Sequence, residues 1–261
     1  MITIDSYVVR NRKIVVSSGI DHDQRLKSFI DNFRLPFGIC LSKECYSLKI
    51  ELRSIDNLDD DIIVTAEPIS SNAFAGARRP IILYPQFQKK MIINDDEHWI
   101  WVVTSDDDKF KAQQLLAKYH FRGIPNRGMY IAISNSRPSV RDKIVLGCAV
   151  LDKLTFSVIP YRDEFLSSAN HKIVNCHSTP LLYGIAWASR FVVDQTVPGI
   201  GIGGALAKSL LSIAARYYVP SCDYVEVYAS TKYDWRSDYV NNGSVPMGFL
   251  GKAGYNVCPR A

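Results

Sequence analysis

A glycine-rich stretch in the second half of the chain has the residue types and spacing needed to bind an anion. Residues 190–206 are RFVVDQTVPGIGIGGAL, an apolar segment followed by glycines and then by a helical pattern of apolar residues. Glycine leaves the backbone free to turn and to approach a ligand closely. The N–H groups at the start of a helix bind phosphates. We therefore expect a pyrophosphate to meet the backbone of this loop: Gly199, Ile200, Gly201, Ile202, Gly203 and Gly204.

Two common phosphate-binding loops do not fit this context. Gly199, Gly201 and Gly204 have the G-x-G-x-x-G spacing of dinucleotide-binding units. In those units the strand runs almost directly into the first glycine and further strand–helix units follow. Here residues 194–198 intervene, and the chain after Gly204 is too short for a second mononucleotide-binding half. A GxxxxGK[ST] loop is absent from the sequence, which excludes the P-loop nucleotidases.

The stretch resembles motif A of the GNAT (N-acetyltransferase) superfamily. In that family a strand, a short connection and a [QR]-x-x-G-x-[GA] loop lead into a helix that receives the pyrophosphate of coenzyme A. Residues 198–203, PGIGIG, occupy the loop, with Pro198 in place of the Arg or Gln donor. The resemblance also implies that a backbone N–H of the preceding strand, at Phe191, Val192 or Val193, binds the thioester carbonyl.

A second match to the family lies near the end of the chain. Residues 249–255, FLGKAGY, resemble the family's F-Y-x-K-x-G-[FY], and residues 224–228 precede them as the fifth strand does in that family. Leu250 stands where the family often has a tyrosine that acts as general acid. Tyr255, Tyr239 and Tyr228 are the candidate replacements, although tyrosines also commonly pack in cores.

Acetyl transfer to an amine also needs a group that removes a proton from the amine. Asp194, Glu226 and His177 are candidates for this base, and Glu226 is central in its expected strand. A solvated carboxylate or a hydrogen-bonded histidine is the alternative interpretation for each of them.

His120 follows the first helix of this half of the chain and adjoins aromatic residues. It resembles the His-Tyr pair of Mom-type DNA-modification proteins, which have a GNAT-like fold and modify adenine. That resemblance implies a catalytic or metal-binding role. The alternative is a histidine that interacts with carbonyl groups at the end of the helix.

The expected elements position these residues in a C-terminal domain. We expect strands at 98–104, 129–134 and 144–151, a strand that begins near 183 and ends at 193, and helices at 106–119 and 205–218. Ser105 is the expected N-cap of the first helix. This order of elements matches that of the GNAT fold.

The first part of the chain is expected to be rich in strands. The pattern indicates strands at 2–9, 13–16, 46–53, 62–66 and 81–84, a helix at 23–33, and a connection at 85–95. No motif indicates a role for this region, which leaves acceptor binding, dimerisation and partner binding open.

Composition favours a soluble, cytoplasmic protein without membrane contact. The chain is 47% apolar, enough to bury a core, but no apolar run approaches the roughly 20 residues of a bilayer span. The N-terminus lacks the order of a signal peptide. Six cysteines without C-x-x-C spacing indicate neither a zinc ribbon nor a disulfide framework, and no metal is expected.

The sequence therefore predicts an α/β (α+β) protein with a β-rich region at 1–95 and a GNAT-like domain at 96–261, a mixed sheet flanked by helices. The expected activity is transfer of an acetyl group from acetyl-CoA (coenzyme A) to an unidentified amine acceptor. A net charge of +5 and basic clusters in the N-terminal part leave open a nucleic-acid-modifying or nucleic-acid-binding protein, and a non-catalytic interaction module is a third alternative.

Overall fold

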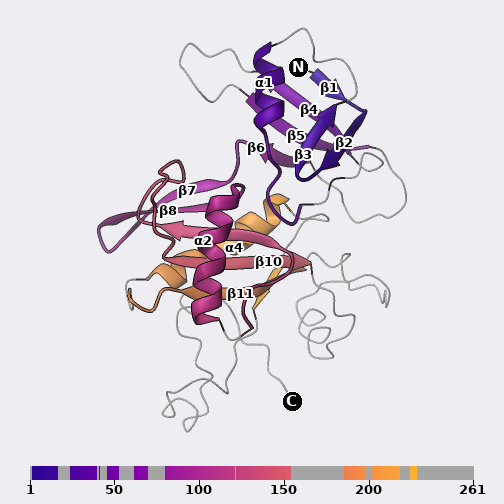
Figure 1. Ribbon diagram of the computed structural model, residues 1–261. Helices are drawn as coiled ribbons and strands as arrows, with labels where there is room; N and C mark the ends of the chain where they lie inside the picture. The colour runs from indigo at the N-terminus through magenta and orange to yellow at the C-terminus, as the bar shows by residue number, and fades with distance from the viewer. Residues whose placement is uncertain are drawn as a thin grey trace, which may run out of the picture.

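The computed structural model describes residues 2–16, 24–39, 41, 46–52, 62–69, 80–120, 122–153, 185–197, 201–217 and 224–227 (Figure 1). At residues 153, 185, 187 and 224–227 only the backbone is described. The elements are β1 (Ile2–Ile4), β2 (Tyr7–Arg10), β3 (Lys13–Val16), α1 (Gln24–Asn32), β4 (Tyr46–Leu52), β5 (Ile62–Pro68), β6 (Ile81–Tyr84), β7 (Gln88–Ile93), β8 (Asp96–Val102), α2 (Asp106–Tyr119), β9 (Met129–Ser134), β10 (Gly147–Lys153), β11 (Ile185–Val193), α4 (Ile202–Tyr217) and β12 (Tyr224–Val227).

The N-terminal region contains an antiparallel sheet in the order β1-β4-β5-β6 and a separate β2–β3 hairpin. β4 alternates as its sequence predicts, with Tyr46, Leu48 and Ile50 buried. α1 lies against β3 and buries Leu26 and Ile30. The predicted β-rich character of this region is confirmed for the described residues.

The C-terminal part forms a six-stranded sheet in the order β12-β11-β10-β9-β8-β7. Its neighbours are antiparallel except β11 and β12, which are parallel. α2 covers one face of this sheet and α4 the other (Figure 1). Trp101 and Cys148 pack on the α2 face, whereas Ile100 and Ala149 pack on the α4 face. The predicted mixed α/β class is confirmed.

β7 was not expected, because the sequence indicated a connection at 85–95. It forms a hairpin with β8, from the pair Gln88↔Trp101 to the pair Ile93↔Asp96. Exposed lysines and a glutamine at its start break the apolar alternation. Lysines are common on an edge strand because they discourage pairing with another chain. The C-terminal sheet therefore includes residues on both sides of the expected boundary at 95.

Arg12 joins the N-terminal region to the start of α2. Its guanidinium donates to the carbonyl oxygens of Thr104 at 2.6 Å and Leu35 at 3.3 Å. It also pairs with Asp106 at 3.2 Å and stacks 3.5 Å from the ring centroid of Phe37. Desolvation lowers the pKa of Arg12, against the opposing effect of Asp106.

The last turn of α4 makes a second connection between the two sheets. Arg216 donates to the carbonyl oxygen of Ile82 at 3.2 Å and to that of Pro85. The hydroxyl of Tyr217 accepts a hydrogen bond from the N–H of Phe87 at 2.8 Å. α4 therefore bridges β6 and β7 at its end.

The start of α2 lies where the sequence predicts it, after an N-cap at Ser105. The Ser105 hydroxyl accepts from the N–H of Asp108 at 3.1 Å, as an N-cap does. Lys111 pairs with Asp107 at 3.0 Å and donates to the carbonyl oxygen of Arg141 at 2.5 Å. The helix is thus tied to the connection between β9 and β10.

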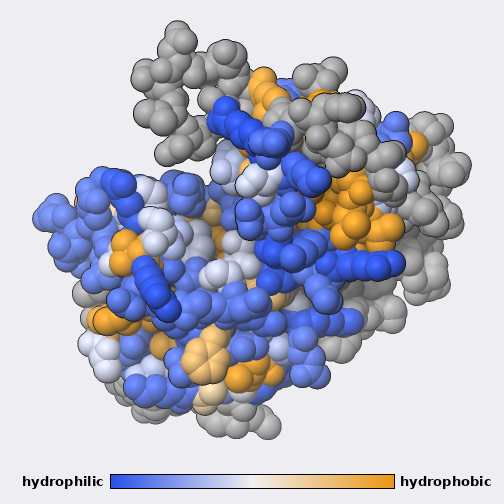
Figure 2. Space-filling view, turned by 45° about the horizontal axis from the view of Figure 1, so that its top comes forward, coloured by the Kyte–Doolittle hydropathy of each residue, from blue (hydrophilic) through white to orange (hydrophobic). Residues whose placement is uncertain are grey.

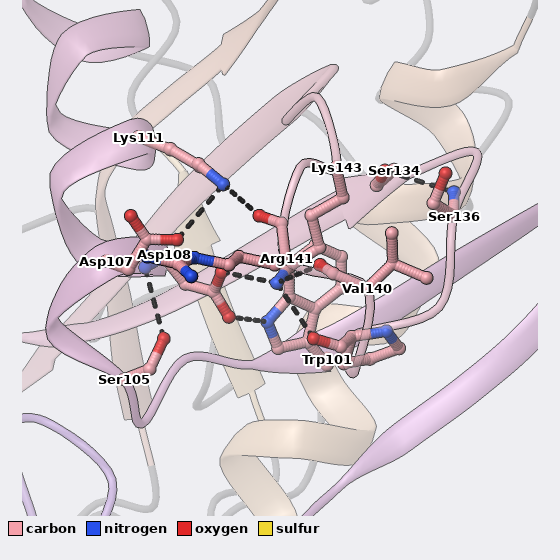
Figure 3. Close-up of polar contacts among 11 residues, drawn as sticks. Trp101, Ser105, Asp107, Asp108, Lys111, Ser134, Ser136, Val140, Arg141 and Lys143 are labelled. Atoms are coloured by element: carbon pink, nitrogen blue, oxygen red, sulfur yellow. Dashed lines mark hydrogen bonds and ion pairs between the residues drawn. The ribbon is translucent and has the colours of Figure 1, made fainter.

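A buried ion pair strengthens this tie (Figure 3). The Lys143 ammonium lies 2.6 Å from the Asp108 carboxylate, and their side chains are only 4% and 8% exposed. Lys143 also donates to the carbonyl oxygens of Pro138 at 2.8 Å and Val140 at 3.0 Å. Asp108 accepts from the indole N–H of Trp101 at 3.3 Å. These bonds hold the connection between β9 and β10 over the sheet.

The described surface exposes several large apolar side chains. Figure 2 shows a mostly hydrophilic face, with a larger hydrophobic group toward its right side. Val8 and Val15 lie directly opposite each other in the β2–β3 hairpin and are 42% and 48% exposed. Among the described helices, none has the length and apolar character needed to cross a membrane.

Candidate functional site

Near its end, β11 has one edge bonded to β10 and a second edge that faces away from β10. The N–H of Asp194 binds the carbonyl oxygen of Leu146 at 2.8 Å. Because hydrogen-bonding direction alternates along an antiparallel strand, the backbone of Val192 faces β10, and those of Phe191 and Val193 face the opposite edge. Of the three residues expected to bind a thioester carbonyl, Phe191 and Val193 therefore direct their N–H groups away from β10. Val193 is the one at the end of the strand.

β12 occupies only the first part of that edge. The parallel pairing runs from Ile185↔Tyr224 to Ala188↔Val227. A bulge follows in β11, because Val150 of β10 pairs with Arg190 whereas Leu151 pairs with Ala188, which leaves Ser189 unpaired in the register. Residues 189–193 consequently extend past the described part of β12, and Val193 has no strand neighbour there among the described residues.

A compact turn follows β11 and is built on Asp194. Its carboxylate accepts from the N–H and the hydroxyl of Thr196, each at 2.9 Å, and from the hydroxyl of Tyr119 at 3.1 Å. The hydrogen bond from the Thr196 N–H is the main cause that lowers the pKa of Asp194. An ionised carboxylate with three donors suits an anchor better than the proton acceptor considered from the sequence. Tyr119, which the sequence did not single out, ties α2 to this turn.

α4 begins at the glycines, three residues before its expected start. Gly201 has a φ of +90°, a conformation that favours glycine. The N–H of Ala205 binds the carbonyl oxygen of Gly201 at 3.0 Å, so Gly201 is the N-cap. The N–H groups of Ile202, Gly203 and Gly204 therefore have no acceptor within the helix. Gly201 has no side chain to cap them, which leaves donors for an anion at this end.

Close contacts seat this helix start on the sheet. A Cβ atom on Gly201 would lie 3.2 Å from Cγ2 of Ile93 in β7. A Cβ atom on Gly147 in β10 would lie 2.9 Å from Cγ2 of Ile133 and 3.3 Å from Cγ2 of Ile202. The first residues of α4 therefore reach from β7 to β10, and the glycine at 147 makes room for them.

His120 lies at the C-cap of α2. Its backbone N–H binds the carbonyl oxygen of Leu116 at 2.9 Å, and its Nδ1 accepts from the N–H of Arg122 at 3.2 Å. Desolvation, followed by the charges of Arg190 and Arg122, lowers the pKa of His120 to about 4. The imidazole is neutral at neutral pH, and a base with so low a pKa accepts protons weakly there.

The remaining predicted residues are only partly located. Glu226 lies in β12, where its backbone pairs with that of Trp187. The other candidates and motif positions lie outside the described residues: Pro198, Gly199, Ile200, His177, Tyr228, Tyr239, Leu250 and Tyr255. The described structure thus brings together β11, the Asp194 turn and the start of α4, but it does not bring a base or an acid to them.

A groove of about 580 Å³ lies between the two regions, at α1 and the end of β8. Phe33 and Tyr84 line it, together with Arg34, Gln86 and Thr104. Gln86 donates to the carbonyl oxygen of Arg34 at 3.1 Å and accepts from the Thr104 hydroxyl at 3.0 Å. The Gln86 amide, the Thr104 hydroxyl and the Arg34 carbonyl oxygen are thus bonded to one another.

Among the described residues, no group of three or more His, Cys, Asp or Glu side chains could hold a metal ion. Burial raises the pKa of the Cys148 thiol, which keeps it protonated inside the sheet. Comparison of the chain with protein-family models, curated proteins and solved structures finds no match.

Proposed function

We propose that this protein is a coenzyme A-dependent N-acyltransferase with a GNAT-like C-terminal domain, and that acetyl-CoA is its donor. The observation that carries the proposal is the start of α4. Three backbone N–H groups, of Ile202, Gly203 and Gly204, lie there without a helical acceptor behind a glycine N-cap. Such a terminus suits the pyrophosphate of coenzyme A.

The connectivity around this helix supports the proposal. β11, α4 and β12 form a strand–helix–strand unit with parallel strands. In such units ligands bind beyond the carboxyl ends of the strands. The carboxyl end of β11 leads through the Asp194 turn to the start of α4, so the phosphate donors and the backbone edge of Val193 belong to one short segment.

The proposed reaction forms a C–N bond and breaks a C–S bond. The acceptor amine attacks the thioester carbonyl, loses a proton, and the thiolate of coenzyme A leaves and gains a proton. A backbone N–H at Val193 would stabilise the negative charge that develops on the carbonyl oxygen. Glu226 as the base and Tyr255 as the acid remain part of the proposal, whereas the lowered pKa of His120 makes it a weak base.

Binding of acetyl-CoA, measured by calorimetry, tests the proposal. Gly204 is the third residue of α4 and is partly exposed. A Gly204→Glu side chain would favour the helix, because acidic residues stabilise a helix N-terminus, but its carboxylate would repel the pyrophosphate. Gly204→Ala is the matched control, since it also replaces glycine in the helix but adds no charge.

We expect the wild type and Gly204→Ala to bind acetyl-CoA at micromolar concentrations, and Gly204→Glu to bind at least about tenfold more weakly, a loss of about 1.4 kcal/mol. Failure of the wild type to bind, or equal binding by Gly204→Glu, would contradict the proposal. In that case salt-dependent binding of DNA or RNA would favour the nucleic-acid alternative. If binding is found, mass spectrometry of amines incubated with acetyl-CoA would identify the acceptor class.

A further inference from the structure

We propose that the groove between α1 and the end of β8 binds a nucleotide, with the base against the rings of Phe29 and Tyr84 and the phosphate on Arg34. The volume of this groove, about 580 Å³, is within the range of small-molecule sites. The proposal goes beyond acetyl transfer and does not depend on it.

Three aromatic rings form an apolar wall of the groove. Phe29 and Phe33 of α1 stack with their ring centroids 5.5 Å apart. The ring of Tyr84, at the end of β6, lies 4.9 Å from that of Phe29 and 6.2 Å from that of Phe33. Phe33 is buried, whereas Phe29 and Tyr84 are partly exposed. Partly exposed rings in a groove provide surfaces on which a nucleobase stacks, since every base has a flat aromatic face.

Arg34, which also lines the groove, is held by one nitrogen of its guanidinium. Nη1 donates to the carbonyl oxygens of Asp31 at 2.7 Å and Phe33 at 2.9 Å. Nε and Nη2 have no acceptor among the described residues. This edge of a guanidinium binds phosphate through two parallel hydrogen bonds. Arg34 is therefore oriented by the protein and still has donors for a ligand.

The charges around the groove favour an anion. Arg25 and Arg34 are among the described residues that line it, and none of these residues is acidic. Desolvation lowers the pKa of Arg12, Asp106 opposes this effect, and the nearby positive charge of Arg34 lowers the pKa further. Asp106 is paired with Arg12, and Asp31 is exposed and does not line the groove. A bound phosphate would relieve the repulsion between Arg12 and Arg34.

Polar groups in the groove suit a sugar and the edge of a base. The hydroxyls of Ser28 and Tyr84 have no hydrogen-bond partner among the described residues. The amide nitrogen of Asn32 donates to the carbonyl oxygen of Ser28 at 2.9 Å, which leaves the amide oxygen as an acceptor. Aromatic rings, a free arginine edge and several small polar groups together match a nucleotide, which has a base, a phosphate and hydroxyl groups.

The groove and the glycines of α4 are separate sites. The last turn of α4 bonds to the backbone at Ile82, Pro85 and Phe87. Tyr84 and Gln86 of the groove lie between these residues in the chain. Because α4 has 16 residues it is about 24 Å long, and its glycines are at the other end. A nucleotide in the groove would thus not occupy the start of α4.

Calorimetry with the four ribonucleoside monophosphates, their nucleosides and inorganic phosphate tests the proposal on the wild type. At least one monophosphate should bind, and more tightly than its nucleoside or inorganic phosphate, because only the nucleotide fills both parts of the groove. Salt should weaken binding of the nucleotide but not of the nucleoside, which carries no charge. Absence of binding by every monophosphate, or binding no tighter than that of inorganic phosphate, would overturn the proposal.

Two variants locate the bound nucleotide. Arg34→Gln should weaken nucleotide binding roughly tenfold to a hundredfold, as for loss of a charge-assisted hydrogen bond, and leave nucleoside binding unchanged. Phe29→Leu stays apolar but removes a ring, and should weaken binding of both about fivefold or more. Arg10→Gln is the matched control, since Arg10 is exposed in β2 and does not line the groove. Equal affinities of Arg34→Gln and Arg10→Gln, with both folded by circular dichroism, would overturn the proposal.

Ultraviolet cross-linking of the nucleotide to the wild type does not depend on the folding of any variant. Mass spectrometry should find the nucleotide attached to Phe29 or Tyr84, and attachment only at residues away from the groove would overturn the proposal. A short single-stranded RNA that binds more tightly than the monophosphate would support a nucleic acid as the source of the nucleotide. RNA that binds no more tightly would support a free nucleotide.

The same variants distinguish this proposal from the acyltransferase. Arg34→Gln should still bind acetyl-CoA, and Gly204→Glu should still bind the nucleotide. Loss of nucleotide binding in Gly204→Glu but not in Arg34→Gln would assign the nucleotide to α4 and overturn the proposal. Nucleotide binding by a wild type that does not bind acetyl-CoA would support the groove and contradict the acyltransferase.

Discussion

Removing one partner of the buried pair Asp108 and Lys143 should strongly destabilise the protein. Their side chains are 8% and 4% exposed and their charged atoms are 2.6 Å apart. Asp108→Asn keeps the size of the side chain but leaves the Lys143 ammonium buried with two carbonyl oxygens as acceptors. Removing one partner of a buried ion pair costs about 3–5 kcal/mol, because the other charge stays uncompensated. For a chain of this length that corresponds to a fall in Tm of roughly 6–20 °C.

Urea unfolding of four proteins measures the effect: wild type, Asp108→Asn, Lys143→Met and the double variant. The double variant should cost at least about 1 kcal/mol less than the sum of the single variants, because it leaves no unpaired charge. Lys90→Gln is the control, since Lys90 and Glu97 form an exposed pair that contributes about 1 kcal/mol or less. A cost below about 1 kcal/mol for Asp108→Asn, or simple additivity, would refute this reasoning.

Three other perturbations concern the sheet and the candidate site. Gly147→Ala should lower the free energy of unfolding by about 1–3 kcal/mol, because its Cβ would lie 2.9 Å from Cγ2 of Ile133, and an unchanged melting temperature would contradict this. The pKa of His120 is about 4 in the folded protein against 6.5 ordinarily, so its stabilising effect is present above about pH 6.5 and is lost as the pH falls toward 4. His120→Gln should therefore lose less stability than the wild type over that range, and parallel curves from urea unfolding would argue against it. Tyr119→Phe removes the hydrogen bond to Asp194 and should cost about 1 kcal/mol and weaken acetyl-CoA binding, whereas unchanged values of both would show that this bond does not position the turn.

Local patterns predicted much of the secondary structure. α2 has the predicted bounds because Ser105 and three acidic residues mark its first turn. β4 (Tyr46–Leu52) was predictable because its alternation is a direct consequence of one buried face. β7 was missed because an edge strand tolerates lysines, which a search for alternating apolar residues passes over.

The candidate site was predictable only in part. The glycines signalled the helix start, although α4 begins at Ile202, earlier than its apolar pattern indicated. The Tyr119–Asp194 bond joins residues far apart in the sequence. Such contacts depend on strand order and register, which a single sequence does not specify.

The bond between the end of α4 and the start of β7 determines where the chain can be divided. A fragment that began at residue 96 would lack the edge strand, expose the edge of β8, and leave the Tyr217 hydroxyl without the Phe87 N–H. It would also lose the Ile82 and Pro85 carbonyl groups that hold Arg216. The fragment would also lack Ile93 of β7, which Gly201 meets at the start of α4. The smallest fragment that keeps both ends of α4 in place therefore includes β6, the final strand of the N-terminal sheet.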